Sequence, residues 1–351
     1  MRRGVVGRIR VGVLSGAAAV AAAAALALPL GAAAITYAPV DQPGPALSVP
    51  QSDLDASLLC TDSVAGASRA PVLLVPGTGS NPPHNFGWNW EPALNQLGIP
   101  WCAVTLPKNA LGDIQEAGEY VVNAIRTMYA RAGRKIAIIG HSQGGMLPRW
   151  ALRFWPDTRA MVDDDIGFAA SNHGTTGSQF VCSLPCPEAF WQQSNTAEFI
   201  KALNSYRETF AGISYTEVYS HTDEIVTPNS DDNGSSSLHG GGGEIENEAV
   251  QEICPTDLNE HNALGTVDNV AYALAIDATG LTDAASTAAD LLTNIATYPG
   301  VSAEPQLRCY VTASCPASGV AANKAKCKKK KRKHHAVASK RQGCKKRHKK
   351  R

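Results

Sequence analysis

The sequence has very few basic residues between its two ends. Of the 32 lysines and arginines, four lie in residues 1–34 and sixteen in residues 324–351, which leaves 12 in the central part against all 31 aspartates and glutamates. The central part therefore carries a formal charge near −19. Because a surface this acidic repels phosphates, the composition argues against nucleic-acid binding by the central part.

The sequence also lacks any cluster of cysteine and histidine with zinc-site spacing, although it contains nine cysteines. In an exported chain these cysteines favour disulfide bonds over metal binding. A bond between Cys60 and Cys102 would close a loop of about 40 residues and contribute about 4 kcal/mol in the chain-entropy model. Cys182 and Cys186 are close enough to staple a local loop. The odd count leaves one thiol over, and the pairing stays open for Cys254, Cys309, Cys315, Cys327 and Cys344.

The first 34 residues have the composition of an export signal. Four arginines lie among the first ten residues, an apolar run extends from Val11 to Leu30, and small residues follow at 32–34, where cleavage is expected. This order is typical of a signal peptide and predicts a secreted protein. The apolar run is also long enough to span a bilayer, so an uncleaved membrane anchor is the alternative.

The remaining chain divides by composition into three parts. Residues 35–57 are rich in proline and predict an extended arm. Residues 58–323 show no break in composition and are long enough for one large core, so we expect a single domain, and we expect it to be monomeric. Residues 324–351 form a basic tail that is too polar to fold alone. The tail either binds an anionic cell envelope through its charge or is a solvated extension.

The central domain alternates between apolar strands and amphipathic helices. This alternation predicts a doubly wound α/β fold with a mostly parallel sheet. The expected strands are 70–75, 100–106, 136–139, 166–170 and 213–219, and the expected helices are 113–131, 196–206, 263–276 and 284–295, with one more directly after the strand at 136–139.

Three segments have no clear periodicity. Residues 171–193 are irregular, and segments of this length are usually lids or binding loops, the alternative being a tolerated insertion. Residues 229–243 are of low complexity and predict a flexible surface loop. Residues 244–254 fit either a helix or a strand.

The stretch from Lys135 to Trp150 is typical of a nucleophile elbow. The apolar, mostly β-branched run from Ile136 to Ile139 is followed by Gly140, Ser142 and Gly144. Apolar residues at helical spacing come next. In this G-x-S-x-G pattern a strained turn holds the serine hydroxyl clear of the backbone above a parallel sheet. Glycines two residues away on either side remove side chains that would collide there. We therefore expect Ser142 to be a nucleophile.

A nucleophilic serine needs a histidine base and a carboxylate that orients this base. In this type of fold both follow the serine, first the acid and then the histidine. Asp223 directly follows the strand at 213–219, so we expect it at the carboxyl end of the sheet, with Glu224 as the neighbouring alternative. His261 precedes a predicted helix and is the expected base. The other histidines fit less well, since His173 and His221 precede the acid and His239 lies in the glycine-rich loop.

The oxyanion of an acyl transfer needs at least two hydrogen-bond donors, each worth about 3 kcal/mol. One donor is expected from the backbone N–H of Gln143, the residue after the nucleophile. The other is expected from the loop at 77–79, where Thr78 offers an N–H and a hydroxyl. The alternative interpretation of this loop is a plain strand-to-helix turn.

Six stretches carry a family resemblance. They are LDASLLC at 54–60, VLLVPGTGS at 72–80, YVVNAIRTMYA at 120–130, SQGG at 142–145, FWQQ at 190–193 and YSHTDEIVTP at 219–228. With them, residues 54 to about 275 resemble the Candida antarctica lipase B family and its bacterial relatives. The resemblance implies an α/β-hydrolase with helices on both faces of the sheet, which hydrolyses or transfers acyl groups of carboxylic esters without a metal or a cofactor.

Individual positions can be matched as well. The resemblance implies the triad Ser142, Asp223 and His261 with the oxyanion donors Thr78 and Gln143, and it implies a disulfide between Cys60 and Cys102. It also implies that Gln193 lines the acyl pocket. His141 stands where the yeast enzyme has a large aromatic residue in its alcohol pocket, Ser171 replaces an acidic residue, and the CSLPC loop at 182–186 has no counterpart.

The leading hypothesis is a secreted lipase or esterase that works through an acyl-enzyme intermediate. An alternative with the same triad is a polyester depolymerase or an acyltransferase. A non-catalytic protein that binds the cell envelope is the alternative from a different class, because a fold does not guarantee a function. The expected partners are an ester or lipid substrate and, through the tail, an anionic envelope surface.

Overall fold

The computed structural model describes residues 35–279, and the fold below belongs to the unit that begins at Ala38. The predicted signal peptide, the predicted helix at 284–295 and the basic tail lie outside the described residues. So do Cys309, Cys315, Cys327 and Cys344. Among the described helices, none is both long and apolar enough to cross a membrane.

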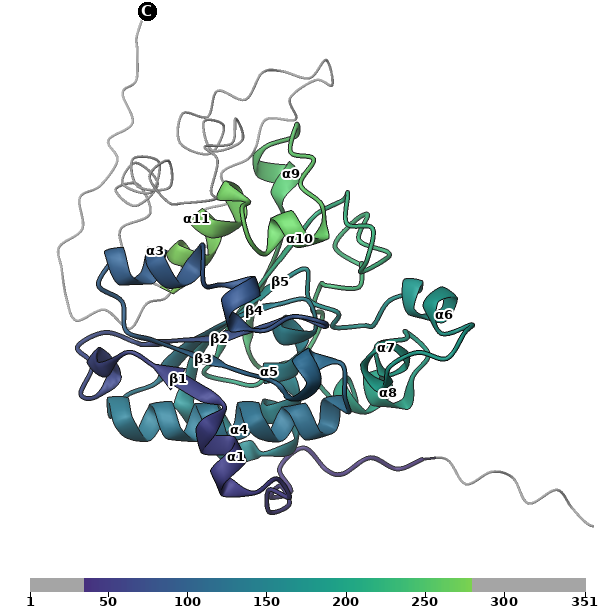
Figure 1. The fold of residues 1–351 in the computed structure, drawn as a ribbon. Coiled ribbons are helices and arrows are strands. Elements are labelled where there is room, and N and C mark those ends of the chain that lie inside the picture. The colour runs from purple at the N-terminus through teal and green to yellow at the C-terminus, as the bar shows by residue number, and fades with distance from the viewer. Residues whose placement is uncertain (1–34, 280–351) are drawn as a thin grey trace, which may run out of the picture. The chain divides into compact units, whose positions relative to one another are not determined.

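A seven-stranded sheet forms the centre of the described fold (Figure 1). Its strand order is β1-β3-β2-β4-β5-β6-β7, and only β1 runs antiparallel to its neighbour. The predicted mostly parallel sheet is therefore confirmed. The strands are β1 (Leu58–Cys60), β2 (Val72–Val75), β3 (Trp101–Val104), β4 (Ile136–His141), β5 (Val162–Phe168), β6 (Ser214–Tyr219) and β7 (Glu244–Ala249).

Helices cover both faces of the sheet, with α4 and α5 on one side and α3 and α11 on the other (Figure 1). Successive residues of a strand face opposite sides, so Leu73 joins the core under α4 and α5 while Leu74 joins the core under α3 and α11. The helices are α1 (Gln51–Ala56), α2 (Pro82–Asn85), α3 (Trp90–Gln96), α4 (Ile114–Ala132), α5 (Gln143–Phe154), α6 (Gly177–Val181), α7 (Glu188–Gln192), α8 (Glu198–Leu203), α9 (Val250–Ile253), α10 (His261–Leu264) and α11 (Asn269–Ala278).

Residues 38–50 lie along α4 and α5. Glu119 of α4 accepts hydrogen bonds from the backbone N–H and the hydroxyl of Ser48, and the indole of Trp155 donates to the carbonyl of Pro45 at 2.9 Å. Arg159 forms an ion pair with Asp41 at 2.8 Å. Both cysteine pairs considered from the sequence are bonded, Cys60 with Cys102 and Cys182 with Cys186.

Three predictions about local structure need correction. The arm predicted at 35–57 is not extended throughout, because Gln51–Ala56 form α1. The segment 229–243 has no helix, but it lies only partly at the surface, because Ser235, Ser236 and Leu238 are buried. The side chain of Asn229 holds this segment, because it donates to the hydroxyl of Ser236 at 3.0 Å and accepts from the backbone N–H of the same residue at 3.0 Å. Composition alone does not reveal such bonds.

The helix predicted over 263–276 is two helices, α10 and α11. The break follows Gly265, where an added Cβ would lie 2.2 Å from the ring of His141. A new helix begins after Asp268, whose carboxylate caps it by accepting from the N–H groups of Val270 and Ala271. Periodicity continues across this break because both helices bury apolar faces on the same side of the sheet.

Candidate active site

Ser142 occupies a strained turn between β4 and α5. Its φ of 57° and ψ of −123° are costly for a residue with a side chain. Its N–H donates to the carbonyl of Phe168 at 2.8 Å, which fixes the turn against β5. A Cβ at Gly140 would lie 2.0 Å from the carbonyl oxygen of Gly144, and one at Gly144 would lie 2.1 Å from that of Val75. Both glycines are therefore required for the turn, as the elbow pattern predicts.

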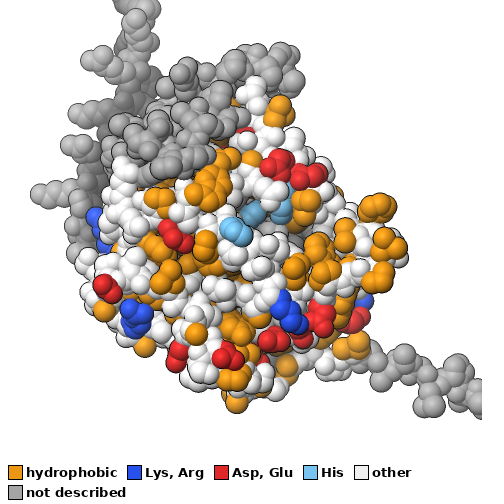
Figure 2. All heavy atoms as spheres, viewed as in Figure 1, with side chains coloured by type: hydrophobic (Ala, Val, Ile, Leu, Met, Phe, Trp, Pro, Cys, Tyr) orange, Lys and Arg blue, Asp and Glu red, His pale blue; other side chains and the backbone are white. Residues whose placement is uncertain are grey.

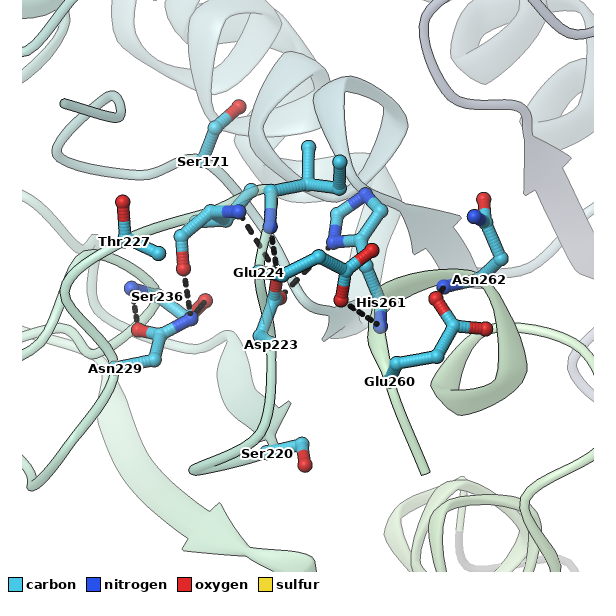
Figure 3. A network of polar contacts seen from close by, with 12 residues as sticks. Ser171, Ser220, Asp223, Glu224, Thr227, Asn229, Ser236, Glu260, His261 and Asn262 are labelled. Atoms are coloured by element: carbon cyan, nitrogen blue, oxygen red, sulfur yellow. Dashed lines mark hydrogen bonds and ion pairs between the residues drawn. The ribbon is translucent and has the colours of Figure 1, made fainter. Parts of the chain in front are cut away.

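Asp223 and His261 form a buried pair (Figure 3). The Nδ1 atom of His261 lies 2.9 Å from Oδ2 of Asp223, and the two side chains are 5% and 0% exposed. The other carboxylate oxygen of Asp223 accepts from the backbone N–H groups of Ile225 and Val226 at 2.9 and 2.8 Å. Asp223 therefore accepts hydrogen bonds at both carboxylate oxygens, and the bond at Oδ2 fixes the tautomer of His261.

The neighbouring acid and the other histidines lie elsewhere. Glu224 contacts His261 through the backbone N–H at 3.4 Å and not through the ring (Figure 3). His173 pairs with Glu208 at 3.0 Å and stacks on His239. Of the histidines considered as the base, His261 is the one that the structure pairs with Asp223.

A pocket of about 430 Å³ opens beside this pair. Histidine side chains gather near the centre of the face shown in Figure 2, and hydrophobic side chains border them on the side of α6 and α7. The segment at 171–193, predicted to be irregular, contains the short helices α6 and α7, and it contributes four lining residues, including Phe190 and Gln193. Ser142 and His261 line the pocket together with Gly77, Thr78, Asn85, Trp88, His141, Ile225 and Val226.

The side chain of Thr78 is held by Gln193. The amide nitrogen of Gln193 donates to Oγ1 of Thr78 at 2.9 Å, and its amide oxygen accepts from the hydroxyl of Ser171 at 2.9 Å. Since Gln193 donates to the Thr78 oxygen, the hydroxyl proton of Thr78 remains available to a ligand. The N–H of Gln143 begins α5, so it has no acceptor within the helix.

His141 is buried beside His261 and contacts two other parts of the site. Its Nε2 lies 3.0 Å from the carbonyl oxygen of His261, and its Nδ1 lies 3.3 Å from the amide nitrogen of Asn85. Burial, with a smaller contribution from the nearby His261, lowers the pKa of His141 to about 3. His141 is therefore neutral at ordinary pH.

Sequence patterns did not identify Asn85. It ends the short helix α2, and its amide oxygen accepts the N–H of Gly77 at 3.0 Å. Asn85 joins Gly77 and His141, which are distant from each other in sequence. Nothing in the stretch NPPHN predicts these contacts. The sequence did place a loop with Thr78 next to the elbow, and the structure brings that loop to the same pocket.

Comparisons with known proteins agree with this architecture. No family model matches the chain. Lipase B of Pseudozyma antarctica is 38% identical over 187 residues, which span 52% of this chain and 54% of that protein, so the match covers about half of the relative's length. The crystal structure of Aspergillus fumigatus lipase B superposes with a TM-score of 0.63 at 29% identity, covering 78% of this chain and 67% of that one. The chain therefore has the α/β-hydrolase fold and resembles these two lipase B proteins in sequence and structure.

Proposed function

We propose that the protein hydrolyses carboxylic esters, with Ser142 as the nucleophile, His261 as the base and Asp223 as the acid that orients the base. One observation carries the proposal: a histidine that is hydrogen-bonded at 2.9 Å to a buried carboxylate lines a pocket together with a serine held at a positive φ. The similarity to two proteins named lipase B supports an ester as the substrate class.

The reaction follows from these groups in two halves. Ser142 attacks the ester carbonyl while Nε2 of His261 takes the hydroxyl proton, since Nδ1 is already bonded to Asp223. The imidazolium then gives this proton to the leaving alkoxide, which departs as an alcohol and leaves an acyl-enzyme. In the second half a water molecule loses a proton to His261 and attacks the acyl carbon, and the serine oxygen recovers the proton as the acid is released.

The oxyanion of each tetrahedral intermediate would be stabilised by Thr78 and Gln143. The N–H of Gln143 lies at the amino end of α5, where the helix dipole adds positive potential. Thr78 adds a hydroxyl whose oxygen is already held by Gln193. A donor that is held before the reaction needs no reorganisation when the charge develops.

A fluorophosphonate probe and a p-nitrophenyl ester test this function. The full chain should be labelled and should hydrolyse the ester, and Ser142→Ala should do neither. Ser230→Ala is the matched control, because Ser230 is an exposed serine outside the pocket. Hydrolysis that survives Ser142→Ala would refute the mechanism, and an unlabelled wild-type chain would favour a non-catalytic scaffold.

The same pocket determines which acyl-chain length is preferred. It also determines whether the main activity is ester hydrolysis, polyester cleavage or acyl transfer. A panel of p-nitrophenyl esters from short to long, beside emulsified triglyceride, a polyester film and an added alcohol acceptor, separates these three activities. A pocket bordered by Phe190 and Ile225 favours an apolar acyl group. We expect hydrolysis of soluble esters to be the main activity.

We also propose that the protein works outside the cytoplasm and that its basic tail binds an anionic envelope. Two disulfides suit an oxidising compartment. The tail carries sixteen of the 32 basic residues. Truncation after Asn323 should release wall-bound activity, and high salt should release the full chain. Equal retention of both forms at low and high salt would refute the tether.

A further inference from the structure

We propose that His141 is a positioning residue that fixes the base relative to the oxyanion loop through a chain of hydrogen bonds from Gly77 through Asn85 and His141 to the carbonyl of His261. This inference rests on the ester hydrolysis proposed above. This series of hydrogen bonds joins three segments that are far apart in sequence, at residues 77–85, 141 and 261. The two residues whose side chains form it, Asn85 and His141, are 4% and 5% exposed. One of its members, His141, directly precedes Ser142 in the sequence.

The direction of each hydrogen bond follows from its acceptors. A backbone carbonyl can only accept, so Nε2 of His141 carries a proton and donates a hydrogen bond of 3.0 Å to the carbonyl oxygen of His261. In a neutral ring Nδ1 must then accept, and the donor is the amide nitrogen of Asn85 at 3.3 Å. The amide oxygen of Asn85 is thereby left to accept the N–H of Gly77 at 3.0 Å. Each of these three hydrogen bonds thus has one donor and one acceptor, so a single assignment of the protons satisfies all three bonds.

Burial keeps this arrangement stable. The pKa of His141 lies near 3 mainly because the ring is desolvated, so the ring does not become an imidazolium in neutral solution. A charged ring would donate from both nitrogens, and the amide of Asn85 would have to turn its oxygen toward Nδ1 and away from Gly77. The neutral form therefore preserves the contact with the oxyanion loop.

Packing leaves the imidazole ring of His141 little freedom. An added Cβ at Gly265 would lie 2.2 Å from the ring, so the backbone after α10 closes directly over it. The ring of His261 lies on another side with a centroid separation of 5.0 Å. A Cβ at Gly77 would lie 3.5 Å from Nδ1 of the ring. A ring fixed in this way can hold the backbone of His261 at a defined position.

Besides the hydrogen bond from its backbone N–H to Glu224, two contacts position His261. Asp223 holds the ring of His261 at Nδ1, and His141 holds its backbone carbonyl. Without the second contact, α10 could shift while the ring stays bonded to Asp223, which would move Nε2 relative to the serine. Since a displacement of about 1 Å can lower a rate about 100-fold, this contact should affect kcat more than substrate binding.

The test compares His141→Phe with His141→Gln in the full chain. Phenylalanine fills the space and makes neither hydrogen bond, whereas the amide of glutamine can donate to the carbonyl of His261 and accept from Asn85. We expect His141→Phe to lower kcat for a short p-nitrophenyl ester about 10- to 100-fold with KM changed less than about twofold, and His141→Gln to restore most of kcat. His239→Phe, at an exposed histidine outside the pocket, is the control.

Thermal unfolding of each variant separates a positional effect from a failure to fold. Equal kcat values for the two variants, at similar unfolding temperatures, would overturn the inference. A second readout does not depend on turnover: the NMR signal of the Nδ1–H proton of His261 should broaden in His141→Phe and stay sharp in His141→Gln. If the wild-type chain fails to hydrolyse esters, the proposed function is wrong, and this signal still decides whether His141 positions His261.

Discussion

Replacing Asp165 by asparagine should change how the stability of the protein depends on pH. Asp165 lies on β5, is 1% exposed, and neither of its carboxylate oxygens has a hydrogen-bond partner within the described residues. Its pKa is raised to about 7, because the loss of solvation on burial, with a smaller contribution from neighbouring Asp164, outweighs the attraction of Arg149. The folded protein therefore holds a proton that the unfolded chain, with an ordinary pKa of 3.8, releases.

The sign of the effect follows from this difference in proton binding. Between the unfolded-state and folded-state pKa values the folded protein binds more protons, so its free energy of unfolding falls as the pH rises. The contribution is fully present below the unfolded value of 3.8 and is lost as the pH rises through the folded value near 7. At about 1.4 kcal/mol per pKa unit, the loss between about pH 5 and about pH 8 is about 3 kcal/mol.

Urea unfolding followed by tryptophan fluorescence measures this loss. From about pH 5 to about pH 8 the wild-type chain should lose about 3 kcal/mol relative to Asp165→Asn, whose amide does not titrate. Arg149 keeps its hydrogen bonds to Asn172 and Asn204 in this variant, so its fold should persist. Asp163→Asn on the same strand is the control, since its side chain is 57% exposed. A stability difference that is the same at both pH values would refute the reasoning.

Three further predictions concern the site and its frame. Ser142→Gly should raise the free energy of unfolding by about 1 kcal/mol in denaturant titrations while abolishing hydrolysis, because glycine adopts a positive φ without strain; a lower stability than that of Ser142→Ala would contradict this. Thr78→Val should lower kcat about 100-fold, and Thr78→Ser should retain most of it; equal rates would show that the hydroxyl plays no part. Removing the disulfide in Cys60→Ala/Cys102→Ala should cost about 4 kcal/mol of stability, since it closes a loop with a sequence separation of 42, whereas Cys182→Ala/Cys186→Ala, with a separation of 4, should cost less.

The sequence predicts the elements whose physical causes are local. The elbow is recognisable because a positive φ at Ser142 and close backbone contacts both demand glycines at fixed spacing. The helix predicted at 113–131 begins at Ile114, since the carboxylate of Asp113 caps it by accepting from the N–H of Gln115. These causes act within a few residues, and a single sequence records them.

The features that sequence analysis missed depend on distant contacts. Strand β1 is only three residues long and none of its residues is fully buried, so it has no readable pattern and exists because it pairs with β3. At Gly265, directly after α10, the ring of His141 leaves no space for a Cβ, and this contact joins residues that are distant in sequence. Position alone assigned His141 to the substrate pocket, and it does line the pocket, but its bonds to Asn85 and His261 could be found only in three dimensions.

The oxyanion loop, residues 77–79, is held by hydrogen bonds to Asn85 and to Gln193. These bonds determine which of its groups can still donate a hydrogen bond to a substrate. The N–H of Gly77 already donates to Asn85, so it is not free to bind an oxyanion. The oxygen of Thr78 accepts from Gln193, which leaves the hydroxyl proton as a donor. In the proposed mechanism Gln193 would therefore act on the oxyanion through Thr78. Removing the donor itself in Thr78→Val should therefore slow hydrolysis more than Gln193→Leu, which removes only the group that orients the donor.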